Sequence, residues 1–98
     1  MWWVERPHVG RRPHLVLTRA EAVPVLHSVI AIPATRTIRG LRMEVPLGPE
    51  DGMPAECVLS CDHTTLVPKA LFTDRICQLR GEQMHEVCRA LALATGCS

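Results

Sequence analysis

The amino-acid sequence predicts a mainly β fold, a small antiparallel β-barrel closed by one C-terminal helix. Eight prolines and six glycines divide the chain into short apolar runs, a pattern typical of short strands joined by turns. Only the last stretch of the chain changes to the spacing of a helix. The chain has 98 residues, 47% of them hydrophobic and 21% charged, so we expect one folded domain over residues 1–98.

The first two strands are predicted on either side of a basic connection. Met1–Arg6 begins with apolar side chains and stops before Pro7, which has no backbone donor. His14–Thr18 has the apolar and β-branched residues of a second strand. Residues 7–13 between them have a proline at each end and a glycine inside, which favours a loop.

The next two strands are predicted around an arginine-rich connection. Residues 19–26 can form a helical turn whose length is limited by Pro24. Ser28–Ile32 is β-branched and apolar enough for a fully buried strand, which we expect to end at Pro33–Thr35. Leu41–Val45 then alternates between apolar and polar residues as a strand does.

The second half of the chain predicts further strands and then the helix. Glu56–Ser60 and Arg75–Leu79 are strands by composition, and Leu66–Phe72 is either extended or a single helical turn, so we expect five to seven strands. Helical spacing follows, with Glu82 at the start and Gly96 just past the end. The apolar residues with this spacing are Met84, Val87, Cys88, Leu91 and Ala92.

Charge is divided unevenly along the chain. Residues 1–43 contain seven arginines and two acidic residues, a balance of +5, whereas residues 44–98 have a balance of −4. Arginine stays charged and its planar fork matches phosphate oxygens in pairs, so the N-terminal half predicts a polyanionic partner. Ordinary solvated surface charge is the alternative. No apolar run approaches the roughly 18 residues of a membrane span, so we expect no membrane partner.

Five cysteines are an odd number, without paired CxxC spacing and without a visible secretory signal. We therefore expect reduced thiols and a cytoplasmic location rather than a disulfide framework. A zinc site is an alternative, because several possible ligands lie close in sequence. These are Cys57, Cys61, His63, His85 and Cys88.

The chain has no phosphate-binding loop, dinucleotide fingerprint or zinc-protease motif. What remains is arginine, histidine, threonine and aspartate near strand ends. Metal-independent RNA cleavage needs proton-transfer groups and cations around the reacting phosphate. His8, His14 and His63 have the right kind of pKa for the first task, and Arg11 and Arg12 suit the second.

Three motifs resemble one family, the MazF/PemK (Kid-like) toxins of bacterial type II toxin–antitoxin systems. Arg12–Thr18 resembles that family's second strand, of pattern RP-x-(V/L)-V-(V/L)-(S/T). Val29–Thr35 resembles its V-x-V-x-P-x-T strand, and Cys57–His63 its strand with C-D-(Q/N). The segment to Leu79 and the helix at Met84–Leu93 match its last strand and closing helix. The motifs occur in the family's order and cover nearly the whole chain.

The resemblance implies an SH3-like barrel of the CcdB/PemK type that forms a homodimer and is neutralised by a cognate antitoxin. It implies cutting of single-stranded RNA at a short sequence without metal or cofactor, leaving a 2′,3′-cyclic phosphate and a 5′-hydroxyl. The target would be messenger RNA, with transfer or ribosomal RNA as alternatives.

By position, Arg12 would be the catalytic arginine and Thr35 the threonine at the scissile phosphate. Ser60 departs from the family, because some relatives have an arginine there. Pro13 fixes the backbone beside Arg12. We expect Arg12 and Thr35 to end neighbouring strands, so that both can face one phosphate. The residues expected to contact RNA are Arg11, His8, Arg36, Arg39, Asp62 and His63.

Other interpretations stay open for the chain and for its residues. A non-nucleolytic relative of the CcdB type, which inhibits a protein such as DNA gyrase, shares the expected fold. The Arg12 and Thr35 pair favours the nuclease. The end of the chain, residues 92–98, lacks the bulky residues expected of a gyrase inhibitor. Structurally, Arg12 can be a solvated turn charge, Thr35 can bond its own backbone, and Asp62 can cap a turn.

Overall fold

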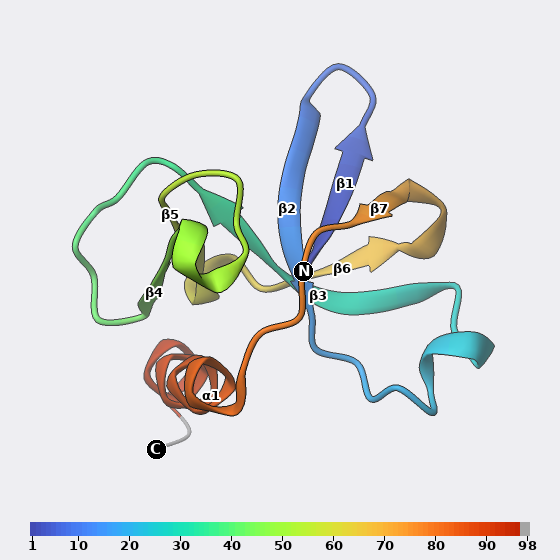
Figure 1. The fold of residues 1–98 in the computed structure, drawn as a ribbon. Helices are drawn as coiled ribbons and strands as arrows, with labels where there is room; N and C mark the ends of the chain where they lie inside the picture. The colour runs from blue at the N-terminus through green and yellow to red at the C-terminus, as the bar shows by residue number, and fades with distance from the viewer. Residues whose placement is uncertain (97–98) are drawn as a thin grey trace.

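The structure, a computed structural model, describes residues 1–96, and within them the chain forms seven strands and one α-helix (Figure 1). Four short 3₁₀ helices, η1 to η4, lie between the strands. The strands are β1 (Trp2–Arg6), β2 (Gly10–Val16), β3 (Ser28–Thr35), β4 (Glu44–Leu47), β5 (Cys57–Ser60), β6 (Thr65–Pro68) and β7 (Phe72–Arg75). The helix is α1 (Gly81–Thr95), and the 3₁₀ helices are Val23–Val25, Pro49–Asp51, Cys61–His63 and Lys69–Leu71.

The strands pair antiparallel in the order β4-β5-β3-β2-β1-β7, and β6 also pairs with β3. The long strand β3 joins the two halves of the molecule, because its first four residues pair with β6 and its last two pair with β5. Between these two stretches β3 also pairs with β2. Figure 1 shows β3 running from the side of β6 and β7 towards the smaller sheet of β4 and β5. β3 therefore pairs with three different strands and links the two sheets.

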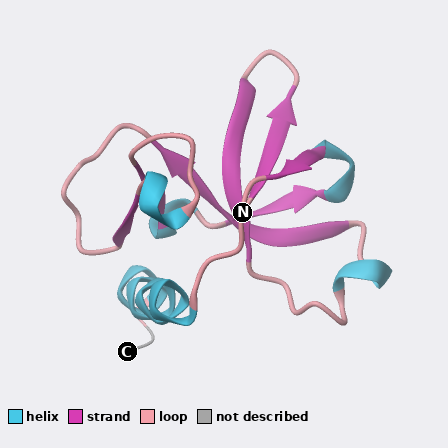
Figure 2. Ribbon diagram, viewed as in Figure 1, coloured by secondary structure: helices cyan, strands magenta, loops and turns pink. Residues whose placement is uncertain are grey.

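The main core lies between the β3–β5–β4 sheet and α1. The helix turns its buried residues Val87 and Ala90 towards this sheet, and Ile32 and Leu59 are fully buried beneath them. Figure 2 shows α1 packed below the small sheet, apart from the β1–β2 hairpin. A second, smaller apolar cluster lies under the hairpin and is formed by Val4, Ala31 and Val67. The helix therefore covers one face of the small sheet and leaves the other face for the loops.

The mainly β fold, its strand count and the C-terminal helix are confirmed. The basic connection predicted over residues 7–13 is wrong, because β2 begins at Gly10 and pairs with β1 from Arg6–Gly10 to Trp2–His14. Only Pro7–Val9 form the turn, in which His8 has φ +65°. Pro13 fits into β2 because β2 has β3 as a second neighbour only from His14 onwards.

β3 ends at Thr35, inside the stretch Pro33–Thr35 where its end was predicted, because Ala34 and Thr35 gain β5 as a partner. Two other predicted strands differ. β4 begins at Glu44 rather than Leu41, since residues 36–43 form a loop. The strand predicted at Arg75–Leu79 is wrong. The pairing of β7 with β1 ends at Trp2–Arg75, and beyond it the Ile76 amide donates to the Met1 carbonyl while the Met1 amino group donates to the Cys77 carbonyl.

Cys57, Cys61, Cys77 and Cys88 are free thiols, and Cys97 and Ser98 lie outside the described residues. In the described part of the chain, no three His, Cys, Asp or Glu side chains gather closely enough to hold a metal ion. None of its helices is long and apolar enough to cross a membrane.

Candidate functional site

The face of the small sheet opposite α1 is set by strand register. Ala34 pairs with Leu59 and Thr35 with Val58, so successive side chains alternate between the helix side and the open side. Ala34 and Leu59 belong to the core beneath α1. Thr35, Val58 and Ser60 therefore share the opposite face, where loop 36–43 lies over the sheet.

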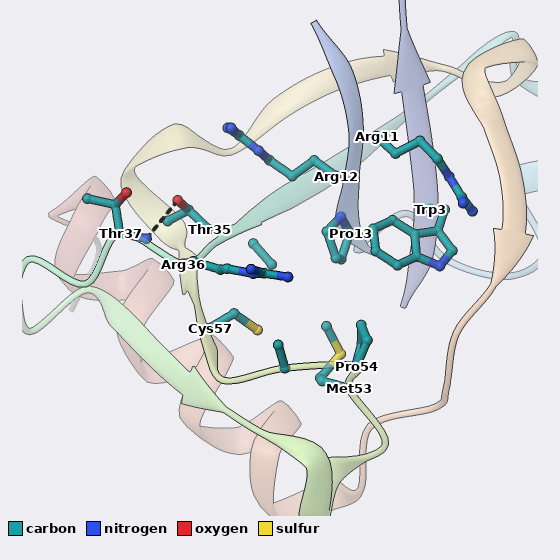
Figure 3. A pocket seen from close by; sticks show the side chains of 12 residues that line it. Trp3, Arg11, Arg12, Pro13, Thr35, Arg36, Thr37, Met53, Pro54 and Cys57 are labelled. Carbon is teal, nitrogen blue, oxygen red and sulfur yellow. Dashed lines mark hydrogen bonds between the residues drawn. The ribbon is translucent and has the colours of Figure 1, made fainter.

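A larger hollow of about 400 Å³ opens beside the small sheet, between residues 53–57 and the β1–β2 hairpin (Figure 3). Arginines stand at its rim, while its floor is mostly apolar. The Arg11 guanidinium lies 4.6 Å from the centre of the Trp3 ring, so these two side chains form one wall. The lining residues are Trp3, Arg11, Arg12, Pro13, Ala34, Thr35, Arg36, Thr37, Met53, Pro54, Ala55 and Cys57.

A second, smaller hollow of about 170 Å³ adjoins the first, and all of its lining residues except Pro33 carry a polar group in the side chain. Arg12, Thr35 and Thr37 line both hollows. These three residues therefore stand on the boundary between the two hollows. The full lining of the smaller hollow is Arg12, Pro33, Thr35, Thr37, Arg39, Ser60 and His63.

The four arginines around the hollows differ in whether a carboxylate already neutralises them. Arg11 forms an exposed ion pair with Asp74 at 3.2 Å. Arg39 is bound by two carboxylates, as described below. Within residues 1–96, the guanidinium groups of Arg12 and Arg36 have neither a hydrogen bond nor an ion pair. Arg12 and Arg36 are therefore the cations that can accept an anionic ligand without first giving up a partner.

The Thr35 hydroxyl is fixed by its own loop. The Thr37 amide donates to Thr35 Oγ1 at 3.1 Å, the dashed contact in Figure 3. Because Oγ1 accepts this bond, the hydroxyl proton stays available to donate to a ligand. The local backbone bond considered as an alternative role for Thr35 is therefore present, and it orients the hydroxyl at the boundary of the two hollows.

Arg39 holds loop 36–43 against the sheet. Its Nε donates to Glu44 Oε2 at 2.8 Å, and its Nη1 and Nη2 donate to the two oxygens of Asp62 at 3.1 and 2.9 Å. Glu44 also accepts from the Arg39 and Leu41 amides at 3.1 and 3.2 Å. The sequence offers Arg39 as a free RNA contact, whereas the structure shows it occupied by two acids.

These hydrogen bonds lower the pKa values of both carboxyl groups. The Arg39 side chain holds the pKa of Asp62 below its ordinary value. Burial acts to raise the pKa of Glu44, but the hydrogen bonds from Arg39 and from the Leu41 amide outweigh it, so that pKa is also lowered. Both carboxylates are therefore charged at neutral pH and remain bound to Arg39.

Acidification is expected to release loop 36–43. Since the pKa values of Glu44 and Asp62 are lowered in the folded chain, their contribution to stability is complete above the unfolded values near pH 4. It is lost as the pH falls from there through the lowered folded values. Thermal unfolding between pH 7 and 2.5 should show a smaller acid loss in Glu44→Gln than in the wild type.

Asp74→Asn is the matched control, because its ion pair with Arg11 is exposed and does not involve Arg39, Glu44 or Asp62. That variant should keep the acid loss of the wild type. An unchanged acid loss in Glu44→Gln would show that Glu44 does not stabilise the fold through its charge.

Residues 53–55, which form the floor of the larger hollow, are attached to the start of α1. Asp51 accepts from the Gly48 amide at 2.9 Å and from the Gln83 side chain, and Arg80 Nη2 lies 3.5 Å from the same carboxylate. Gln83 also accepts from the Arg80 amide, which closes the helix N-terminus. The helix therefore fixes the loop that ends in Met53 and Pro54.

The structure brings together most of the residues predicted to form the site. Arg12, Thr35, Arg11, Arg36, Arg39 and His63 line one or both hollows. Asp62 does not line either hollow, but it binds Arg39 and lies 3.7 Å from His63.

Two histidines are not part of this arrangement. His8 sits at the turn of the β1–β2 hairpin, beside residues 70–73 rather than beside Arg12. His14 is buried on β2, and burial lowers its pKa, so it stays neutral. Of the histidines offered by the sequence for proton transfer, only His63 lines one of the two hollows that contain Thr35, whereas His14 lines a separate hollow beside Arg12.

Sequence reasoning missed Trp3, Met53, Pro54, Cys57 and Thr37 as lining residues, and it did not assign Ser60 a role in the site. Trp3 was identifiable as an aromatic residue one strand away from Arg12, but its face depends on strand register. Burial raises the pKa of the Cys57 thiol, so this side chain contributes an apolar surface rather than a nucleophile.

Comparison with known proteins gives a consistent result. The family model described as PemK-like, MazF-like toxin of type II toxin–antitoxin system matches residues 1–95. The chain is 38% identical over 99 residues to a probable endoribonuclease, MazF5 of Mycobacterium tuberculosis, with 100% of this chain and 91% of that protein covered.

Solved structures are similar over nearly the whole chain. The Mycobacterium tuberculosis toxin MazF-mt6 matches with a TM-score of 0.87 and 31% identity, covering 98% of this chain and 97% of that one. A MazE-MazF crystal structure from Deinococcus radiodurans matches with a TM-score of 0.81 and 27% identity, covering 99% and 92%. The predicted barrel fold and the predicted resemblance are thus confirmed.

Proposed function

The chain belongs to the PemK-like, MazF-like toxin family of type II toxin–antitoxin systems, and on this premise we propose that Arg12 and Thr35 perform its endoribonuclease reaction. The observation that supports this assignment most directly is the position of the two residues. Both line both hollows, and the Arg12 guanidinium has no partner among the described residues. A single-stranded RNA crossing the boundary would bring one phosphate to both side chains.

The reaction we propose is attack of a ribose 2′-oxygen on the adjacent phosphorus, with release of the next 5′-oxygen. The products are a 2′,3′-cyclic phosphate and a 5′-hydroxyl. The phosphate gains negative charge in the transition state, and donors already in place stabilise it there. Arg12 supplies two charged N–H donors, and Thr35 supplies the hydroxyl proton that its bond to Thr37 leaves available.

The other site residues are proposed to bind and shape the RNA path. Arg36 is the second cation without a partner and suits a neighbouring phosphate. The larger hollow, with its apolar floor at Met53 and Pro54 and its wall at Trp3, has room for a base. Arg39 and Asp62 would act chiefly through the shape of loop 36–43, because they bind each other.

Three further residues complete the proposed RNA contacts. Arg11 contacts RNA from the wall that it forms with Trp3, and His63 does so from the smaller hollow. His8 could meet only a longer RNA that reaches the hairpin turn. We further propose one toxin domain over residues 1–98, which the family match to residues 1–95 supports.

The partners follow from the family. MazF structures from Deinococcus radiodurans include MazE-MazF forms, which supports a cognate antitoxin as a partner of this chain. We also propose a homodimer and action in the cytoplasm, where messenger RNA is available. A CcdB-like inhibitor of gyrase is not favoured, because the family model and the relatives are PemK-like and MazF-like.

The test is incubation of the purified protein with a long single-stranded RNA in excess EDTA, followed by mapping of the fragment ends. We expect discrete cuts at one short recurring sequence, with 5′-hydroxyl ends. A matched reaction with added Mg²⁺ instead of EDTA should give the same cuts. Intact RNA in both reactions would refute the endoribonuclease proposal.

A further inference from the structure

The smaller hollow contains an unused hydrogen-bonding group. Ser60 lines this hollow and is 2% exposed, and its Oγ is the one buried side-chain polar atom of residues 1–96 without a hydrogen-bond partner. A hydroxyl removed from water without a partner costs free energy of folding, so such groups are rare in native proteins. Each group of this kind in a native structure needs an explanation, and a catalytic role or a bound species is among those known.

The register of β5 explains why Ser60 faces this space. Glu44 pairs with Ser60 and Thr35 pairs with Val58, so Ser60 lies on the face that bears Thr35 and Glu44. The opposite face of β5 presents Leu59 to the core beneath α1. Ser60 therefore lies under the loop that Arg39 fastens to the sheet.

The chemistry of the hollow indicates an anionic ligand. Its other polar side chains are donors or can donate: Arg12, Thr35, Thr37 and His63. Arg39 is already neutralised by Glu44 and Asp62, which leaves Arg12 as the unneutralised guanidinium of this lining. The volume of about 170 Å³ admits a phosphate group but is small beside the space of the larger hollow.

We propose that the smaller hollow seats a phosphate of the RNA and that Ser60 Oγ donates a hydrogen bond to one of its non-bridging oxygens beside Arg12. This inference rests on the proposed endoribonuclease function and adds a positioning residue to it. The two hollows then have different tasks: the smaller one holds the phosphate, and the larger one holds a base.

The first variant is Ser60→Ala, measured for RNA cutting and for thermal stability. Loss of one hydrogen bond to a charged group should lower kcat/KM by about 10- to 100-fold. The melting temperature should stay the same or rise, because the variant removes an unsatisfied buried hydroxyl. Ser60→Thr, which keeps a hydroxyl on a strand position that accepts β-branched residues, should restore part of the activity.

The second measurement uses an RNA in which sulfur replaces one non-bridging oxygen at the mapped cleavage site. Sulfur accepts hydrogen bonds weakly, so one of the two sulfur isomers should be cut more slowly by the wild type. The same substitution should slow Ser60→Ala less, because the bond that it weakens is already absent. Ser28→Ala, a serine-to-alanine change at the far end of β3, should cut both isomers as the wild type does.

The outcomes separate this inference from the proposed function. Wild-type protein that cuts no RNA overturns both. Wild-type cutting with equal rates for the two sulfur isomers, or with Ser60→Ala as active as the wild type, overturns the phosphate seat alone. If Ser60→Ala loses both melting temperature and activity, the phosphate seat is also overturned, because Ser60 then has a purely structural role.

Discussion

Arg12→Ala is expected to lower the rate of RNA cutting by roughly 100- to 1,000-fold, the usual cost of removing one donor aimed at a developing negative charge. Among the described residues, Arg12 is the arginine whose guanidinium has no hydrogen-bond or ion-pair partner and which lines both hollows. No other arginine can replace it, since Arg11 and Arg39 are bound to carboxylates and Arg36 lines only the larger hollow. The measurement is the cutting rate of a mapped RNA in EDTA.

The fold should not suffer from this change. The Arg12 side chain is exposed and makes no hydrogen bond within the described residues. Its removal should therefore leave the free energy of unfolding within about 0.5 kcal/mol of the wild-type value. Arg12→Lys keeps the charge but loses the planar fork, and it should recover only part of the activity. Arg19→Ala, at an exposed arginine outside both hollows, is the matched control and should cut as the wild type does. Wild-type cutting by Arg12→Ala would refute its catalytic role.

Leu59→Ala is expected to be the most destabilising of the substitutions considered, with a loss of about 2–5 kcal/mol in the free energy of unfolding. Leu59 is 0% exposed and lies between β3, β4 and α1, where little can move to fill the space. Small domains have only about 5–15 kcal/mol of stability, so a large share would be lost. Urea unfolding measures the difference.

Leu66→Ala is the matched control, because Leu66 on β6 is 63% exposed and should change stability by less than about 0.5 kcal/mol. Under conditions where Leu59→Ala remains folded, its RNA cutting should be close to wild type, since Leu59 lines neither hollow. Equal destabilisation by the two variants would contradict the burial of Leu59 under α1.

The sequence predicted well those elements whose pattern depends on neighbours along the chain. The helical spacing from Met84 to Ala92 and the β-branched run at Ser28–Ile32 are local signals, and α1 and β3 formed where they indicated. The start of β2 was not predictable in this way. Its residues include Gly10 and Pro13, which favour loops, and only pairing with β1 makes this segment a strand.

In the site too, the features that depend on local sequence were predicted, and those that depend on distant partners were not. The motifs predicted Arg12 and Thr35 at strand ends. Thr35 is the last residue of β3, whereas Arg12 lies inside β2 because β2 begins at Gly10, and the structure brings both residues to the same two hollows. Arg39 was expected to be a free cation because Asp62, its partner, is 23 positions away in the chain. The sequence marked Ser60 only as a departure from the family pattern, since an unpaired buried hydroxyl is recognisable only once its surroundings are known.

The stacking of Arg11 on Trp3 gives the molecule an optical reporter of its own. The chain has two tryptophans, and they are neighbours on β1, so they point to opposite faces of the sheet. Trp3 belongs to the wall of the larger hollow, whereas Trp2 borders a separate apolar groove with Val29 and Phe72. A base that enters the hollow changes the surroundings of one indole and not of the other. Intrinsic fluorescence of this chain therefore follows occupancy of the hollow, without any attached dye.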